Sequence, residues 1–286
     1  MRQSMRVRIA LVLNPKSGSS PDLGVAVRAL EAAGGDVVET ASFPSELDGS
    51  RAERVVVVSG DGMVAAAAEA AARLGVPLGV VAGGTANDFA RTLELPQDLQ
   101  EALALAAAST RTRPMELAYM DSHPFVNVVG AGLAPEAGKH AAPHKGKLGP
   151  LAYPLGALAA GLLSSPLGCR VLVDGREIHA GLTWQVTVAS TGAFGGGSSI
   201  AGADPGDGAL DVLVLSAGSR VTLPQRALGM RRGTLADQRG VKHEQGQEVQ
   251  LICPPGTPLN MDGEIVEAQG LNTFEVHRGA FELVVP

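Results

Sequence analysis

The fold is decided first by residues 55–62, which read VVVVSGDG. Four consecutive valines make a short apolar run typical of a buried parallel strand, and the glycines after it allow a sharp turn into a helix. Two more apolar runs end in the same way: residues 9–13 are followed by NPKSG at 14–18, and residues 76–81 by AGGTAND at 82–88. The carboxyl ends of parallel strands meet at one edge of a sheet, where backbone N–H groups and helix N-termini bind phosphates. The pattern therefore predicts a phosphate site built from three loops.

Strand and helix patterns alternate up to about residue 110, and the rhythm then changes. The first part predicts a doubly wound α/β domain over residues 1–112. Short strands separated by turns predict a mostly antiparallel, β-rich domain over residues 113–286, with helical insertions near 150–163 and 222–232. The pattern leaves open which domain the last strand, Phe281–Val285, joins.

The strands of the second domain are predicted from its apolar runs. Among them are one strand over Phe125–Val129 and separate strands over Glu177–Ala180 and Thr183–Ser190. Asp174-Gly175 and Asp262-Gly263 are two-residue hairpin signals, because both central residues of such a turn need a positive φ.

Composition and charge narrow the class of protein. The chain has 286 residues, 45% of them hydrophobic, and a net charge of −6, which argues for a globular protein and against a nucleic-acid binder. Cys169 and Cys253 make neither a disulfide framework nor a zinc-binding spacing. No signal peptide is apparent, and the longest apolar run, residues 151–163, is too short to cross a bilayer. We therefore expect a cytoplasmic protein without a transmembrane segment.

Each loop has a simpler interpretation when it is taken alone. Gly60-Asp61-Gly62 would serve as a plain strand-to-helix turn, and it lacks the lysine of a Walker A loop. Thr85 and Asp88 have the spacing of a capping box, with Thr85 as N-cap and Asp88 as the third helical residue. Capping does not account for Gly83-Gly84 in front of them. Three loops without a function at one edge of a sheet are also less expected than a single one.

Taken together, the motifs resemble the catalytic domain of the diacylglycerol and sphingosine lipid kinases, and are most similar to their small soluble bacterial members of the YegS type. The resemblance covers nearly the whole chain. It rests on NPKSG at 14–18, GDG at 60–62, GTANDFA at 84–90, TG at 191–192, GGG at 195–197, DPGDGALD at 204–211 and MDGE at 261–264.

The resemblance implies an ATP-dependent kinase whose two domains hold the ATP phosphates between them and whose acceptor is a lipid such as diacylglycerol. The positions that match the family's nucleotide-binding motifs are Asn14, Pro15, Lys16, Ser17, Gly18, Thr40, Ser59, Gly60, Asp61, Gly62, Met63, Gly84, Thr85, Asn87 and Asp88.

The resemblance also implies a catalytic and a metal-binding set. Glu264 matches the family's general base, and Asp262 and Asp61 are the further catalytic carboxylates. Asp204, Asp207 and Ala209 match a magnesium site, to which Asp207 gives its side chain and the other two their backbone carbonyls. Magnesium prefers such oxygen ligands, which Asp61 and Asp262 also offer.

The chain departs from the family pattern beside the second loop. Met63 replaces a threonine, Ala65 and Ala66 replace an Asn-Glu pair, and Ala82 stands where a proline is usual. Two alternatives to a lipid kinase remain. One is a kinase of a non-lipid alcohol such as NAD, which the missing Asn-Glu pair argues against, and the other is a catalytically weak protein that binds nucleotide or lipid, which these departures favour.

The expected partner is a lipid substrate at a membrane surface, on the inner face of the membrane. Two segments place basic groups beside apolar ones: residues 139–147 before 151–163, and Arg226, Arg231 and Arg232 beside Leu223 and Leu228. A solvated loop before a core helix is the simpler interpretation of the first segment. Whether the chain forms a homodimer is left open by the sequence.

Overall fold

The computed structural model describes residues 6–14, 21–84, 86–136, 164–193, 200 and 202–286. The chain forms two compact units, one made of Met1–Leu117 with His277–Pro286 and the other of Ala118–Val276. The division falls a few residues after 112, because β5 (Thr112–Met120) carries the chain from the first unit into the second. The last strand, β15 (Leu271–Val284), begins in the second unit and ends in the first.

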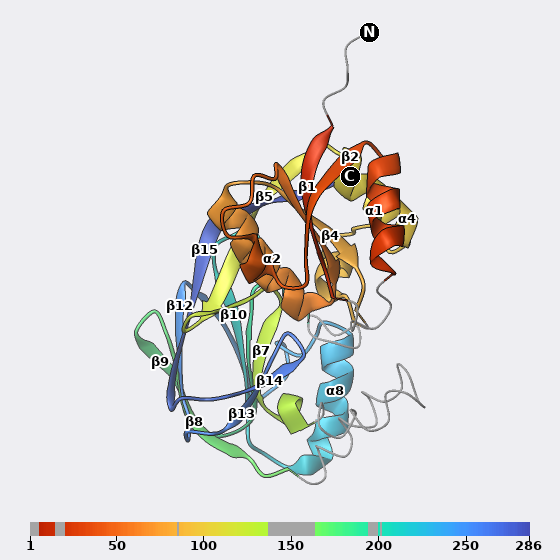
Figure 1. Ribbon diagram of the computed structural model, residues 1–286. Coiled ribbons are helices and arrows are strands. Elements are labelled where there is room, and N and C mark those ends of the chain that lie inside the picture. The colour runs from red at the N-terminus through yellow and green to blue at the C-terminus, as the bar shows by residue number, and fades with distance from the viewer. Residues whose placement is uncertain (1–5, 15–20, 85, 137–163, 194–199, 201) are drawn as a thin grey trace. The chain divides into compact units, whose positions relative to one another are not determined.

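The first unit is built on a parallel sheet in the order β2-β1-β3-β4, of which Figure 1 labels β1, β2 and β4. The end of β15 extends this sheet in parallel, with Leu283 opposite Leu78 of β4. All six residues of β3 are buried, as expected for a strand covered on both faces. The strands are β1 (Val7–Leu13), β2 (Gly35–Ala41), β3 (Arg54–Ser59) and β4 (Leu78–Ala82).

Helices cover the sheet of the first unit. Two of them, α1 (Leu23–Ala32) and α4 (Leu99–Ala108), share an apolar cluster with the side chains of β1 and β3, and Figure 1 shows them side by side. The alanine-rich helix α2 (Asp61–Leu74) lies apart from that pair and contacts β3 and β4. A 3₁₀ turn, η1 (Pro44–Leu47), and the short helix α3 (Asp88–Thr92) complete the layer. The predicted doubly wound α/β fold is confirmed for this unit.

The strand order of the first unit predicts where a ligand binds. The chain moves from β1 outward to β2 and then returns to the other side of β1 as β3, so the order reverses between β1 and β3. Ligands of open α/β sheets bind outside the carboxyl ends of the strands at such a reversal. The segments that leave those two ends begin with Asn14 and Gly60.

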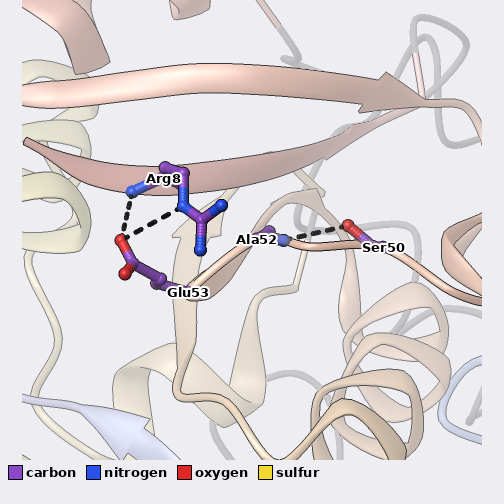
Figure 2. A network of polar contacts seen from close by, with 4 residues as sticks. All are labelled: Arg8, Ser50, Ala52 and Glu53. Atoms are coloured by element: carbon purple, nitrogen blue, oxygen red, sulfur yellow. Dashed lines mark hydrogen bonds and ion pairs between the residues drawn. The ribbon is translucent and has the colours of Figure 1, made fainter.

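Glu53 anchors the start of β3 to β1 at the edge of the sheet opposite the glycine loops (Figure 2). The backbone N–H of Arg8 donates to Oε2 of Glu53 at 3.1 Å, and the guanidinium Nε of Arg8 lies 3.6 Å from the same oxygen. The pKa of Glu53 is lowered, chiefly by the hydrogen bond from the Arg8 backbone. These contacts lie at the start of the parallel register that pairs Ile9 with Arg54 and Leu13 with Val58.

The second unit is a mostly antiparallel β structure, as predicted. Its strands follow the order β14-β13-β7-β9-β8-β12-β15, and β10 pairs with both β9 and β11. The elements are β6 (His123–Phe125), β7 (Val128–Gly132), β8 (Leu167–Val173), β9 (Arg176–Ala189), β10 (Leu210–Ser216), η4 (Arg220–Thr222), α8 (Leu223–Arg231), β11 (Val241–Gly246), β12 (Glu248–Ile252), β13 (Pro258–Met261) and β14 (Glu264–Glu267).

Several predicted elements of the second unit differ from those observed. The single strand predicted over Phe125–Val129 is wrong: β6 and β7 are separated at Val126 and Asn127, whose backbone N–H groups donate to the Asp262 carboxylate. The two strands predicted over 177–190 form the one strand β9. The polar strand β11 was not predicted because its sequence, VKHEQG, has no apolar run. The predicted helix near 222–232 is α8, and the one near 150–163 lies outside the described residues.

A partly buried ion pair between strands β10 and β11 predicts a pH dependence of stability. Nε2 of His243 lies 2.5 Å from Oδ1 of Asp211, whose side chain is 1% exposed. This hydrogen bond is the main cause of the raised pKa of His243. Protonated His243 therefore stabilises the fold below the pKa of an unfolded histidine, about 6.5, and the stabilisation disappears as the pH rises through the raised pKa.

We expect His243→Gln to cost more of the free energy of unfolding at about pH 5.5 than at about pH 8.5, with the charged hydrogen bond worth about 1.5–3 kcal/mol where it is fully formed. Urea unfolding of both proteins at the two pH values measures the difference. An equal cost at both would show that the pair contributes no charge-dependent stability.

Candidate active site

The second and third glycine loops touch through their backbones. The N–H of Gly83 donates to the carbonyl oxygen of Ser59 at 2.9 Å, which continues the contact of β3 with β4 beyond the strands. A Cβ atom placed on Gly84 would lie 2.6 Å from Cα of Gly60, closer than real Cβ contacts come. Glycine is therefore required at position 84 by the approach of the two loops.

Asn87 closes the third loop on itself. Its side-chain Oδ1 accepts from the N–H of Gly84 at 2.8 Å, and its Nδ2 donates to the carbonyl oxygen of Gly84 at 3.1 Å. Asn87 adopts a φ of 53°, which asparagine tolerates better than most residues, and it is the N-cap of α3. The predicted capping box is therefore wrong: the helix begins at Asp88, so Asp88 is not its third residue and Thr85 is not its cap.

The carboxylate of Asp61 supplies the cap that the capping box was expected to provide. Its Oδ2 accepts from the N–H of Asp88 at 3.1 Å and its Oδ1 from the N–H of Phe89 at 3.0 Å. Asp61 is itself the first residue of α2. One side chain thus joins the start of α2 to the start of α3, and this role was not visible in the sequence because its partners lie 27 and 28 residues away.

The other predicted nucleotide-binding residues are distributed along the same edge. Asn14 follows β1, Thr40 is an exposed residue near the end of β2, and Ser59 is buried at the end of β3. Gly62 and Met63 belong to the first turn of α2, not to a loop, because Met63 donates its N–H to the carbonyl of Gly60 at 3.2 Å. Pro15, Lys16, Ser17, Gly18 and Thr85 lie outside the described residues.

The contact between the two glycines makes a prediction. Gly84→Ala should separate the loops, lower the free energy of unfolding by about 1–3 kcal/mol and weaken ATP binding, because backbone atoms have to move. Thermal unfolding and titration calorimetry with ATP measure the two effects. Gly218→Ala is the matched control, since no atom lies within 4 Å of the position of its Cβ. Unchanged ATP affinity in a folded Gly84→Ala protein would remove these loops from the nucleotide site.

In the second unit, the Asp262-Gly263 hairpin is observed as predicted. It joins β13 to β14, with φ values of 47° and 95° at the two residues. Both carboxylate oxygens of Asp262 accept backbone hydrogen bonds: Oδ2 from Val126 at 2.8 Å, and Oδ1 from Asn127 at 3.0 Å and Val128 at 2.9 Å. Asp262 therefore ties the hairpin to the break between β6 and β7.

Three buried polar residues support this hairpin: Thr191, which belongs to the TG motif at 191–192, and Asn127 and Asn260, which the sequence did not single out. Asn260 accepts the N–H of Gly263 on its Oδ1 at 3.0 Å. Thr191 donates its Oγ1 hydroxyl to Oδ1 of Asn127 at 2.8 Å, and both side chains are 3% exposed. For Asn127 and Asn260, a polar residue inside an apolar sequence context was the available signal, since buried polar groups need partners.

Glu264 is the first residue of β14 and lies opposite Met261. Its side chain is exposed, whereas Asp262 two residues earlier is partly buried and held by backbone groups. The turn thus presents one carboxylate to solvent and holds the other in place.

The predicted metal segment forms a tight turn. The N–H of Asp207 donates to the carbonyl oxygen of Asp204 at 3.2 Å, and the N–H of Ala209 donates to Oδ1 of Asp207 at 2.9 Å. Within the described part of the chain, no three His, Cys, Asp or Glu side chains gather as a metal-binding group. One carboxylate with two carbonyl oxygens still fits a hard cation, because every oxygen accepts more than one bond and water completes such shells.

Residues 8–120 match the diacylglycerol kinase catalytic domain, and residues 127–285 match the YegS C-terminal NAD kinase beta sandwich-like domain. The chain belongs to this family of lipid kinases. The resemblance seen in the motifs is confirmed, and so is the class of enzyme, a phosphotransferase with an alcohol acceptor. Among the described residues no helix is long and apolar enough to cross a membrane.

Curated relatives align along most of the chain. A diacylglycerol kinase of Mycobacterium tuberculosis is 26% identical over 275 residues, which cover 90% of this chain and 88% of the relative. A Pectobacterium atrosepticum protein named "Probable lipid kinase YegS-like" is 28% identical over 277 residues, covering 91% and 90%.

Solved structures share the fold. A diacylglycerol kinase of Bacillus anthracis superposes with a TM-score of 0.77 at 22% identity, covering 99% of both chains. An NAD kinase of Archaeoglobus fulgidus, solved with ATP, gives a TM-score of 0.59 at 15% identity and covers 97% of this chain and 93% of its own. At these identities the likeness shows the fold.

The departure from the family pattern at Ala65 has a packing consequence in this lipid kinase. Ala65 is 1% exposed on α2, with Val64 beside it at 2%. The first turn of α2 is thus packed against its surroundings at this position, and a longer polar side chain there would need extra space.

Proposed function

We propose that this lipid kinase transfers the γ-phosphoryl group of ATP to the hydroxyl of a diacylglycerol or a related lipid alcohol. The observation that supports ATP binding is the backbone contact between Gly60 and Gly84 at the carboxyl edge of the parallel sheet. The acceptor is inferred from the curated relatives, of which one is named diacylglycerol kinase.

In this proposal the loops at the sheet edge bind and orient the triphosphate. Backbone N–H groups near Asn14 and Gly60 bind phosphate oxygens, while the N–H of Gly84 is held by Asn87. The Asp61 carboxylate keeps the starts of α2 and α3 together while they do so. In the second unit, the segment Asp204, Asp207 and Ala209 would hold magnesium. Magnesium when bound neutralises the charge that develops on the transferred group.

The proton of the lipid hydroxyl goes to Glu264. As the hydroxyl oxygen forms its bond to the γ-phosphorus and the bond to ADP breaks, the exposed carboxylate accepts the proton. Asp262 fixes the backbone from which Glu264 projects, through its three hydrogen bonds to residues 126–128. We thus infer a positioning role for Asp262 beside its candidate role as a second carboxylate.

The direct test supplies γ-labelled ATP and magnesium with a mixed lipid extract and separates the products. Labelled phosphatidic acid, lost when Glu264 is replaced by glutamine, supports the proposal and names the acceptor. Labelled NADP in a parallel reaction with NAD would favour the NAD alternative, and ATP binding without any labelled product would favour a weak nucleotide- or lipid-binding protein.

We further propose that α8 and the turns around it contact an anionic membrane surface. Residues 219–240 contain five arginines and one aspartate in a chain of net charge −6. Arg231 and Arg232 are exposed, and so are Val221 at 85% and Leu228 at 46%. Leu223, expected at this surface, is instead buried with Trp184 and Leu215. The other predicted basic segment, residues 139–147, lies outside the described residues.

Sedimentation with lipid vesicles tests this surface. Binding to vesicles containing phosphatidylglycerol should exceed binding to pure phosphatidylcholine and fall at least about tenfold in Arg231→Glu/Arg232→Glu, since each basic residue near such a surface is worth about 1 kcal/mol. Arg51→Glu, an exposed arginine of the first unit, is the control. Equal binding of the double variant would exclude α8 as the contact.

A further inference from the structure

The two cysteines lie opposite each other on neighbouring strands of the second unit. Cys169 is in β8, and Cys253 immediately follows β12. The antiparallel register of these strands pairs Leu251 with Val171 and Ile252 with Arg170. One step further along the same register, Cys253 faces Cys169.

Two backbone hydrogen bonds show which kind of cross-strand pair this is. The N–H of Asp174 donates to the carbonyl oxygen of Glu248 at 2.9 Å, so 174 and 248 form a hydrogen-bonded pair. Hydrogen-bonded and non-hydrogen-bonded pairs alternate along an antiparallel ladder. The pair of Cys169 with Cys253 lies five positions along the strands from the pair of 174 with 248, so it belongs to the other kind. The backbone of Cys253 shows the same, because its N–H donates to the carbonyl oxygen of Gly270 in the segment before β15 at 2.9 Å, on the side of β12 away from β8.

The cysteines are therefore a non-hydrogen-bonded pair. In such pairs the Cα atoms lie about 4.5 Å apart and the side chains approach most closely. A disulfide requires Cα atoms about 4.4–6.8 Å apart, so the backbone already has the separation that a bond between the two sulfurs needs. Both thiols are free in the structure.

The surroundings of the two sulfurs differ. Burial raises the pKa of Cys169 to about 11, with a smaller contribution from the neighbouring Cys253. Burial also raises the pKa of Cys253, but hydrogen bonds from Thr257 and Asn272 oppose the effect there. Nδ2 of Asn272 lies 3.9 Å from the Cys253 sulfur. Cys253 thus has partners for a thiolate, and no such partner opposes burial at Cys169.

A shallow groove of about 420 Å³ lies beside the pair, and both cysteines line it. Its other lining residues include Gly168, Gly181, Leu182 and Pro254. A Cβ on Gly181 would meet no atom within 4 Å, so the space above the pair is open. Each of the two cysteine residues is 6% exposed.

We propose that Cys169 and Cys253 are a site of oxidative modification that closes into a cross-strand disulfide by exchange with a small disulfide of the glutathione type. The Cys253 thiolate attacks one sulfur of that disulfide, forms a mixed disulfide and releases one thiolate. Cys169 then attacks the Cys253 sulfur and releases the second. The two cysteines lose two electrons and two protons together, and the small disulfide is reduced to two thiols.

The chemistry of the pair makes this modification slow to form and slow to reverse. Only the thiolate attacks, so below the thiol pKa the rate rises about tenfold for each pH unit. Burial raises the pKa of both thiols, so the reduced, dithiol form gains no stability from its thiolates. The disulfide, once closed, therefore resists reduction.

The experiment incubates the full chain with glutathione disulfide at about pH 7 and about pH 9 and follows intact mass under non-reducing conditions. Wild-type protein should lose two hydrogens without forming dimers, at a rate at least about tenfold higher at the upper pH. Cys169→Ser should stop at one bound glutathione on Cys253, and Cys253→Ser should gain glutathione more slowly.

If either variant fails to fold, the intact mass of the wild-type protein still tests the cross-strand disulfide. A mass that stays unchanged, stable glutathionylation without loss of two hydrogens, or dimers in place of an internal bond would each overturn the cross-strand disulfide. Faster glutathionylation of Cys253→Ser than of Cys169→Ser would overturn the order of attack.

Discussion

Glu264→Gln is expected to lower the turnover number for lipid phosphorylation by about 10²–10⁴-fold, the usual contribution of a general base. Glutamine keeps the size and shape of the side chain but cannot accept the hydroxyl proton. The position is exposed at the start of β14, so the free energy of unfolding should change by less than about 0.5 kcal/mol. Initial rates with saturating ATP and lipid, and a urea unfolding curve, measure the two quantities.

Glu267→Gln provides the matched control. Glu267 is also exposed and is the last residue of the same strand, so its replacement removes the same charge from β14 without touching the Asp262-Gly263 turn. It should retain the wild-type rate. Full activity of Glu264→Gln would contradict the assignment of Glu264 as the base. An equal loss of activity in both variants would show that the overall charge of β14 matters, and not the carboxylate of Glu264 in particular.

Asp262→Ala is expected to lower the free energy of unfolding by at least about 3 kcal/mol and to abolish activity even where the protein remains folded. The change leaves three backbone N–H donors, at residues 126–128, without the carboxylate that accepts from them. Each unsatisfied buried donor costs about 1–3 kcal/mol. Alanine also disfavours the φ of 47° that this turn position requires.

Two variants separate these contributions. Asp262→Asn tolerates the positive φ and keeps one carbonyl oxygen for the backbone donors, so its stability should fall between those of wild type and Asp262→Ala. Asp174→Ala changes the corresponding position of another hairpin, with the same φ of 47°, where the carboxylate accepts from Gln247 and Glu248. It should lose stability and keep its activity per folded molecule. A fully stable Asp262→Ala protein would show that the hydrogen bonds to 126–128 do not hold the turn.

The sequence predicted the site best where the signal was local. The glycines after β3 and β4 and the Asp262-Gly263 hairpin are recognisable because a sharp turn or a positive φ restricts the residue type at that position. It predicted poorly wherever a polar side chain finds its partner far along the chain. The expected capping box at Thr85 and Asp88 failed because Asp61, distant in sequence, satisfies the N–H groups at the start of α3.

The same distinction separates what the sequence determined from what required the tertiary structure. Apolar runs and turn residues determined the parallel α/β unit, the β-rich unit and most of their strands, since strand burial and turn geometry depend on neighbouring residues. Tertiary structure alone decided that Asp262 binds the break between β6 and β7, and that Cys169 faces Cys253 in a non-hydrogen-bonded pair. Which strands pair and which distant polar groups meet is decided by packing between segments far apart in the chain, so no single segment encodes it.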